Sequence, residues 1–110
     1  MSKYRLTDEA KEDLRRIYEY GYEEFGEEQA DEYFYSFFEA FLKIAESPLI
    51  YQSVDNIRPG YRRCPHRSDV IYYRINQSTI EIMAIIGGQD TDVWLLALNG
   101  PVKISGSEQG

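Results

Sequence analysis

The sequence predicts an α+β fold in which a hairpin of two helices packs on a small, antiparallel-rich sheet. Apolar residues recur at three- and four-residue steps from Asp8 to Glu46, and this spacing is the helical period. After Pro48 the period shortens, and two segments rich in β-branched and aromatic residues flank a tight turn, as in a β-hairpin. The predicted order is therefore a short N-terminal strand, two helices, three strands and a short C-terminal helix.

The N-terminal strand is expected at Tyr4-Arg5-Leu6, where apolar and polar residues alternate. Thr7-Asp8 ends it with a helix N-cap, because a side-chain oxygen there can accept a hydrogen bond from an amide of the first turn. The first helix follows with one apolar stripe. The stripe consists of Leu14, Ile17, Tyr18, Gly21, Tyr22 and Phe25. Gly21 lies on it, where a missing side chain would let another backbone come close.

The second helix is expected to begin at Glu27, after the break at Gly26, and to end at Ser47-Pro48. A residue before proline is pushed out of helical geometry, so the helix stops there. Its stripe is aromatic at helical spacing, which is far more typical of core packing than of a cofactor site. The stripe consists of Tyr33, Phe34, Phe37, Phe38 and Phe41, extended by Ile44 and Ala45.

The second half of the chain is expected to form a loop and then three strands. The loop covers residues 49–56, and the strands cover residues 62–65, 69–75 and 79–86. With the helices on one face of this sheet, the other face would be left uncovered.

The C-terminal part is expected to hold a short helix and a tail. Thr91 or Asp92 caps a helix that ends near Leu96. The single domain covers residues 1–98, and residues 99–110 form a tail without core-forming residues.

Composition indicates a one-domain protein of a reducing compartment. The chain has 110 residues, of which 43% are hydrophobic, enough for one modest core. Cys64 is the only cysteine, so no internal disulfide can form. No window approaches the length of a membrane span, and no apolar leader opens the chain. We therefore expect a cytoplasmic protein without membrane contact.

Charge is distributed unevenly along the chain. The net charge of −7 argues against direct binding of nucleic acid. Residues 8–46 hold thirteen acidic and four basic side chains, whereas residues 56–76 hold five arginines and one aspartate. Arginine favours bidentate contacts with carboxylates or phosphates. The five either contact a partner or line a solvated sheet face; they are Arg58, Arg62, Arg63, Arg67 and Arg74.

No catalytic, metal or cofactor site is predicted from the residues. A ribonuclease needs a general base, a general acid and a cation near the phosphate. His66 is the only histidine, and a single loop histidine is more often a surface residue than a catalyst. One cysteine, one histidine and scattered carboxylates lack metal-ligand spacing. Gly87-Gly88 is too short for a phosphate-binding loop, and Cys64 is better explained as a small core residue.

Four segments in sequence order resemble the ParE-type toxins of the RelE/ParE superfamily. The opening, residues 4–14, is similar to the family pattern YxLSxEAxxDL, and residues 25–30 are similar to its helix break xGxxQA. Residues 57–65 resemble the turn and strand LRPGxRxxP, and residues 70–75 resemble the strand hVIxYRI. The resemblance covers about residues 3–95, and it implies a RelE/ParE-like fold.

This resemblance implies the toxin of a type II toxin–antitoxin system. Such a toxin is held inactive by a ParD-like antitoxin and, when free, inhibits DNA gyrase without being an enzyme. The alternative is a messenger-RNA endonuclease of the RelE kind, which acts on the ribosome. The target is expected to contact the five arginines together with Gly88, Gln89, Asp90 and Trp94. The antitoxin is expected to contact Leu14, Tyr18, Tyr72, Tyr73 and Arg74.

The end of the last strand departs from the family pattern. The family has GRQD there, whereas this chain reads Gly87-Gly88-Gln89-Asp90, with Gly88 in place of the arginine. An arginine could pair with a partner's carboxylate or phosphate, an interaction worth about 1.5–3 kcal/mol. This raises the hypothesis of an inactive toxin that retains only antitoxin binding. Arg74 and Asp90 also have a structural interpretation as an ion pair, and Trp94 as a cap on the core.

Overall fold

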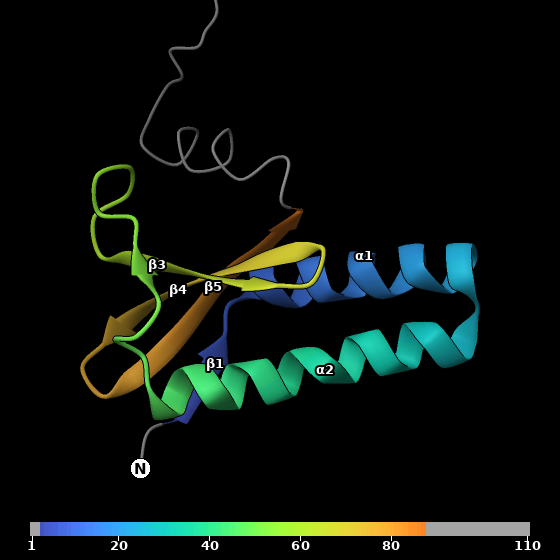
Figure 1. The fold of residues 1–110 in the computed structure, drawn as a ribbon, viewed down its shortest axis with the longest axis horizontal. Coiled ribbons are helices and arrows are strands. Elements are labelled where there is room, and N and C mark those ends of the chain that lie inside the picture. The colour runs from blue at the N-terminus through green and yellow to red at the C-terminus, as the bar shows by residue number, and fades with distance from the viewer. Residues whose placement is uncertain (1–2, 88–110) are drawn as a thin grey trace, which may run out of the picture.

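The computed structural model describes residues 3–87, which form two helices and five strands (Figure 1). Residues 88–110 lie outside the described part, and so do the predicted C-terminal helix and tail. Within residues 3–87 the predicted α+β order is confirmed. In chain order the elements are β1 (Lys3–Leu6), α1 (Asp8–Phe25), α2 (Glu27–Glu46), β2 (Gln52–Ser53), β3 (Tyr61–His66), β4 (Asp69–Asn76) and β5 (Thr79–Gly87).

The strands form one mixed sheet in the order β1-β5-β4-β3-β2. Strands β2 to β5 pair antiparallel, whereas β1 pairs parallel with β5, so that Tyr4 lies opposite Ile80. The two-residue strand β2 lies inside the segment predicted as a loop. Its residues carry no strand pattern of their own, and it forms because β3 offers a pairing edge at Arg62 and Arg63.

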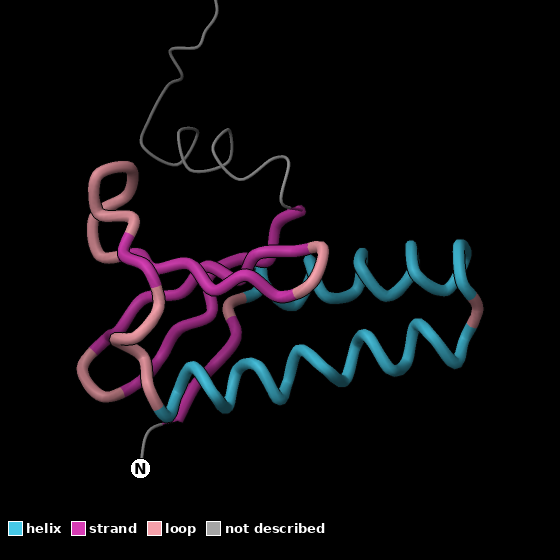
Figure 2. Tube along the Cα trace, viewed as in Figure 1, coloured by secondary structure: helices cyan, strands magenta, loops and turns pink. Residues whose placement is uncertain are grey.

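Both helices begin and end at the predicted signals. The Thr7 hydroxyl accepts a hydrogen bond from the Ala10 amide at 3.1 Å, which caps α1. Gly26 then separates the helices with φ +92°, a conformation that favours glycine, and the chain reverses there (Figure 2). The Gly26 amide still donates to the Tyr22 carbonyl at 3.0 Å. No helix of residues 3–87 is long and apolar enough to span a membrane.

The main core lies between the helical hairpin and one face of the sheet. Helix α2 contributes Phe37 and Phe41, and β5 contributes Ile82, all completely buried. The hairpin extends past the edge of the sheet (Figure 1). No strand therefore lies under its free end, and the stripe residues Tyr22 and Phe25 are 51% and 59% exposed, whereas Leu14 and Ile17 of the same stripe are buried.

The opposite face of the sheet holds a smaller cluster. Tyr61, Val70 and Tyr72 are buried there together with Val54 from the loop before β3. Neighbouring residues of β4 point to opposite faces, so Tyr72 faces this cluster while Tyr73 faces the helices. The face predicted to be uncovered is therefore partly covered by the chain's own loop.

Candidate partner-binding surfaces

Three of the five predicted arginines lie on the sheet face turned away from the helices, which we call the open face. Arg74 follows Tyr72 by two residues on β4, so both point to this face. Arg63 on β3 lies opposite Tyr72. Arg58, in the loop before β3, places its guanidinium 5.2 Å from the ring centre of Tyr61, a member of the cluster on this face.

The other two arginines lie on the helical side. Arg62 donates through Nη1 to the carbonyl oxygen of Tyr51 at 2.7 Å. Arg67, in the turn between β3 and β4, holds its guanidinium 5.6 Å from the ring centre of Tyr33 on α2. The sheet therefore divides the arginines that the sequence suggested as one group.

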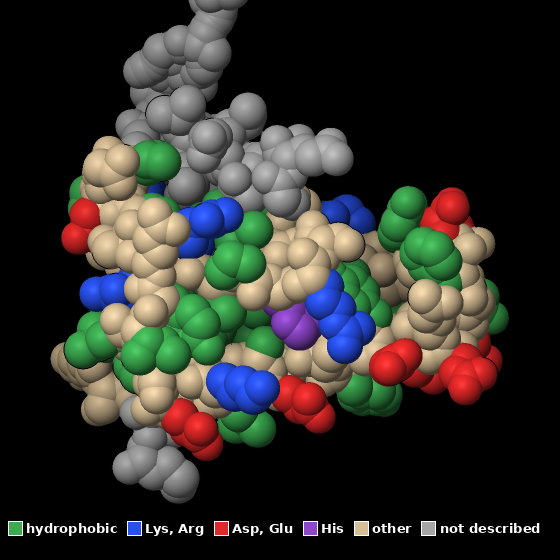
Figure 3. Space-filling model, in the orientation of Figure 1, with side chains coloured by type: hydrophobic (Ala, Val, Ile, Leu, Met, Phe, Trp, Pro, Cys, Tyr) green, Lys and Arg blue, Asp and Glu red, His purple; other side chains and the backbone are tan. Residues whose placement is uncertain are grey.

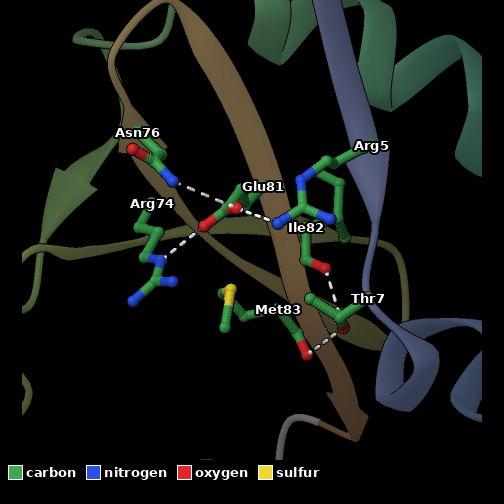
Figure 4. A network of polar contacts seen from close by, with 7 residues as sticks. All are labelled: Arg5, Thr7, Arg74, Asn76, Glu81, Ile82 and Met83. Atoms are coloured by element: carbon green, nitrogen blue, oxygen red, sulfur yellow. Dashed lines mark hydrogen bonds and ion pairs between the residues drawn. The ribbon is translucent and has the colours of Figure 1, made fainter.

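A buried carboxylate holds Arg74 in place. The side chain of Glu81 on β5 is 1% exposed and accepts hydrogen bonds from three side chains (Figure 4). Arg74 donates through Nε at 2.6 Å, Asn76 donates through Nδ2 at 3.4 Å, and Arg5 of β1 donates through a terminal nitrogen. The hydrogen bonds from Arg74 and then Arg5 lower the pKa of Glu81 to about 2, so the carboxylate is charged at neutral pH.

Sequence reasoning missed the roles of Arg5 and Glu81. The alternation of Tyr4-Arg5-Leu6 indicated that Arg5 points away from its apolar neighbours, but it did not give the partner strand. Arg5 and Glu81 are far apart in the chain, and the parallel pairing of β1 with β5 brings them together. A pairing between distant segments leaves no local signal in one sequence.

Tyr72 and Tyr73, two residues predicted to contact an antitoxin, are completely buried. The Tyr73 hydroxyl donates to the carbonyl oxygen of Pro48 at 2.5 Å. Strand β4 is also central, with β3 and β5 bonded to its two edges. Neither side chain therefore presents surface to a partner in this structure.

Hydrogen bonds join the β3–β4 turn to helix α2. The Tyr33 hydroxyl donates to Asp69 at 2.6 Å, and the Ser36 hydroxyl lies 2.8 Å from Nε2 of His66. Burial, followed by the nearby charge of Arg67, lowers the pKa of His66 and favours the neutral ring. These contacts explain His66 as part of the packing between the turn and the helix.

His66 also lies on the other side of the sheet from two of the cations considered for a target site. Its ring packs against Phe37 of the main core, with ring centres 4.5 Å apart and the ring planes tilted by 51°, whereas Arg63 and Arg74 lie on the open face. The described part of the chain therefore does not place this histidine together with Arg63 and Arg74; the arginine beside it is Arg67.

An apolar groove of about 550 Å³ runs along the hairpin, and we call it the hairpin groove. Leu14 and Tyr18, both predicted to contact an antitoxin, line it together. The Tyr18 hydroxyl donates to Asp31 at 2.7 Å, which joins α1 to α2 and raises the pKa of Tyr18 to about 12. The remaining lining residues are Leu6, Lys11, Arg15, Phe34, Tyr35 and Phe38. Arg74, the fifth predicted antitoxin contact, lies apart on the open face.

A second cleft, of about 690 Å³, lies between the free end of the hairpin and the β3–β4 turn. Tyr20 and Phe25 line it from α1, and both are more than half exposed. Acidic side chains gather at this end of the hairpin, at the right of Figure 3, whereas Lys and Arg lie mainly toward the strands. The hairpin and the sheet thus offer surfaces of different charge.

Comparison with known proteins connects this arrangement to a family. The model of the family described as ParE toxin of type II toxin-antitoxin system, parDE, matches residues 4–91. The chain belongs to the ParE toxin family. The resemblance inferred from the four sequence segments is therefore confirmed.

Relatives in the ParE family match most of the chain. The toxin ParE1 of Caulobacter vibrioides is 38% identical over 86 residues, which cover 78% of this chain and 88% of the relative. The toxin ParE1 of Mycobacterium tuberculosis is 31% identical over 86 residues, which cover 77% of this chain and 88% of that toxin.

A solved structure shares the ParE fold. It belongs to a chromosomal ParDE toxin–antitoxin system from P. aeruginosa, with a TM-score of 0.69 and 21% identity over 79% of this chain and 95% of the other. Four residues predicted to contact the target, Gly88, Gln89, Asp90 and Trp94, lie outside the described part of the chain.

Proposed function

We propose that this chain is the toxin of a type II toxin–antitoxin pair and that a ParD-like antitoxin neutralises it in the hairpin groove. Membership of the ParE family supports the pair. The groove supports the location, because Tyr35 is 65% exposed at a site lined by half-buried Phe34 and Phe38. Single-chain proteins seldom leave a large continuous apolar patch open to water. A partner segment with apolar residues at helical spacing fits such a groove between two helices.

The charged side chains at the groove further restrict which antitoxin segment can bind there. Arg15 is already paired with Glu12 and Glu19 of its own helix, whereas Lys11 is exposed. An acidic residue of the antitoxin, next to the apolar residues that enter the groove, would therefore pair with Lys11. Such a rim contact adds specificity more than affinity.

We also propose that the free toxin inhibits DNA gyrase, as the resemblance to ParE-type toxins implies, and that it does so by binding. The use of His66 in packing between the β3–β4 turn and α2 favours binding over ribonuclease chemistry. Gly88, in place of the family arginine, removes one cation from this toxin, and we expect a lower toxicity for that reason.

Co-purification tests the antitoxin. The chain and the protein encoded by the neighbouring gene are produced together with a tag on only one of them, and we expect both in one complex. A chain that stays alone beside this neighbour at micromolar concentration would contradict the proposal.

A growth assay tests the target. The chain and its Gly88→Arg variant are induced with and without the antitoxin, and we expect stronger arrest by the variant, relieved by the antitoxin. Gyrase supercoiling is then measured with purified proteins. New cuts in messenger RNA on translating ribosomes, with supercoiling unchanged, would replace the gyrase proposal with the nuclease.

A further inference from the structure

The open face of the sheet carries an excess of positive charge. Arg5 on β1, Arg63 on β3 and Arg74 on β4 all point to it, and so does Lys3. Glu81 is the one acidic side chain that the described strands place on this face, since Asp69 bonds to Tyr33 on the helical side. On the described strands, the cations of this face therefore outnumber its carboxylate.

The guanidinium of Arg74 is held in one orientation, and its bond to another side chain of residues 3–87 uses only Nε. Its Nε is bonded to Glu81, and its two terminal nitrogens point away from that carboxylate (Figure 4). The terminal nitrogens carry four of the five N–H donors of an arginine. Arg74 and Arg5 are 46% and 62% exposed, so a ligand can reach both.

Glu81 gives this arrangement its rigidity. The Glu81 side chain is 1% exposed, and its carboxylate accepts hydrogen bonds from side chains of two other strands, β1 and β4. A binding group that is held by buried hydrogen bonds on strands loses little side-chain entropy when a ligand arrives. A buried carboxylate that only neutralised one arginine would not need donors from both β1 and β4.

We propose that Arg5, Arg63 and Arg74 form a docking site for the carboxylate side chains of an acidic protein segment. Glu81 is the positioning residue of this site, because its buried carboxylate accepts hydrogen bonds from both Arg5 and Arg74. This inference rests on the proposed function, because it names the chemistry of the partner that the open face contacts.

A protein segment fits this surface better than a nucleic acid does. Duplex DNA carries one negative charge for about every 1.7 Å of its length, so it would also meet the acidic hairpin of a chain with net charge −7. A short segment with a few carboxylates touches the open face alone. Half-buried Met83, which packs against the cluster on this face, offers it apolar contact as well.

Fluorescence anisotropy tests the site with a short labelled peptide of alternating Glu and Gly and the full chain. We expect binding that weakens as salt rises. Arg74→Gln should weaken binding by about tenfold or more, the size of one charge-assisted hydrogen bond. Arg16→Gln is the matched control, because it removes the same charge from α1, away from the open face.

The Glu81→Gln variant distinguishes a positioning role of Glu81 from a simple effect of its negative charge on the open face. If Glu81 only subtracts charge from the face, this variant must bind the peptide more tightly. If it positions the arginines, the variant binds several-fold more weakly although the face has become more positive. Arg74→Lys adds a test that keeps the charge and removes the planar fork, and it should bind nearly as weakly as Arg74→Gln. It also serves if Glu81→Gln fails to fold.

Several outcomes overturn the proposal. These are no binding of the peptide, equal losses from Arg74→Gln and Arg16→Gln, and tighter binding by folded Glu81→Gln. Stronger binding of an oligonucleotide with the same number of charges would assign the face to nucleic acid. None of these measurements uses the antitoxin or gyrase. A negative result would therefore reject the docking site without rejecting the proposed function, which co-purification and the growth assay test separately.

Discussion

At the scale of single residues, the ionisation of Glu81 makes the stability of the fold depend on pH. Burying a carboxylate is unfavourable unless hydrogen bonds and opposite charges compensate, and here three donors do so. The pKa of Glu81 falls from 4.5 to about 2. Between these values the folded chain binds fewer protons at this site than the unfolded chain. Protonation therefore favours unfolding in that window.

We expect the contribution of Glu81 to stability to be complete above about pH 4.5 and to be lost as the pH falls toward 2. Urea unfolding across this range measures it. Glu81→Gln should show a shallower loss of unfolding free energy than the natural chain. Glu39→Gln, at an exposed carboxylate of α2, is the control. Parallel curves for the natural chain and Glu81→Gln would show that Glu81 is not the acid-sensitive group.

Tyr33 is the residue through which α2 holds the β3–β4 turn. Tyr33→Phe removes the hydrogen bond to Asp69 and keeps the ring that packs on Phe37. A hydrogen bond to a charged group is worth about 1.5–3 kcal/mol, and partial exposure puts the expected loss at the lower end. Thermal and urea unfolding measure this loss. Tyr35→Phe, at a 65% exposed position, should leave stability unchanged.

At the scale of elements, glycine stands at two positions of the hairpin for different structural reasons. Gly26 has φ +92°, which a residue with a side chain adopts only under strain. Gly21 lies inside α1, and an added Cβ would be 3.6 Å from the Cβ of Ala30, an ordinary contact distance. The close approach predicted at Gly21 is present, yet it leaves room for a methyl group.

Alanine at each glycine should therefore change stability in opposite directions. Gly26→Ala is expected to destabilise by about 1–3 kcal/mol because of the backbone conformation. Gly21→Ala is expected to stabilise by up to about 1 kcal/mol because alanine is the better helix former. Urea midpoints with unchanged slopes measure both effects. Destabilisation by Gly21→Ala would mean that contact with Ala30 of α2, rather than helix propensity, decides that position.

Local patterns predicted the elements that depend on neighbours in sequence. The stripes of α1 and α2, the cap at Thr7, the break at Gly26 and the β4–β5 hairpin all have such signals. The same rules also imply that Arg62 and Arg63, as neighbours in a strand, point to opposite faces. The parallel pairing of β1 with β5 and the short β2 depend on distant segments, so the Glu81 site could not be predicted.

At the scale of the whole molecule, candidate binding surfaces lie on different layers. The hairpin groove belongs to the helical layer and the end of β1, and the arginines held by Glu81 belong to the far side of the sheet. One long partner segment would have to pass around the edge of the sheet at β1 to reach both. The two surfaces can therefore be tested separately.

Tyr35→Arg tests the groove as the antitoxin site. Tyr35 is 65% exposed, so the substitution should leave the fold intact, while a bulky cation in the groove should weaken antitoxin binding by about tenfold or more. Isothermal titration calorimetry measures the affinity. Tyr20→Arg is a matched control, since Tyr20 is 63% exposed on the same hairpin but lines the second cleft. A larger loss from Tyr20→Arg would move the antitoxin to that cleft.

The parallel pairing of Lys3–Leu6 with residues 79–82 has a consequence for how the chain is made. The first described strand, β1, pairs with β5 among the described strands, so this pairing forms only after β5 has left the ribosome. The helical hairpin forms earlier, but Ile80, Ile82 and Ile85 complete its core only then. A nascent chain that stalls before Thr79 thus exposes the apolar side of its helices, and a complete binding surface arises only after β5 has been made.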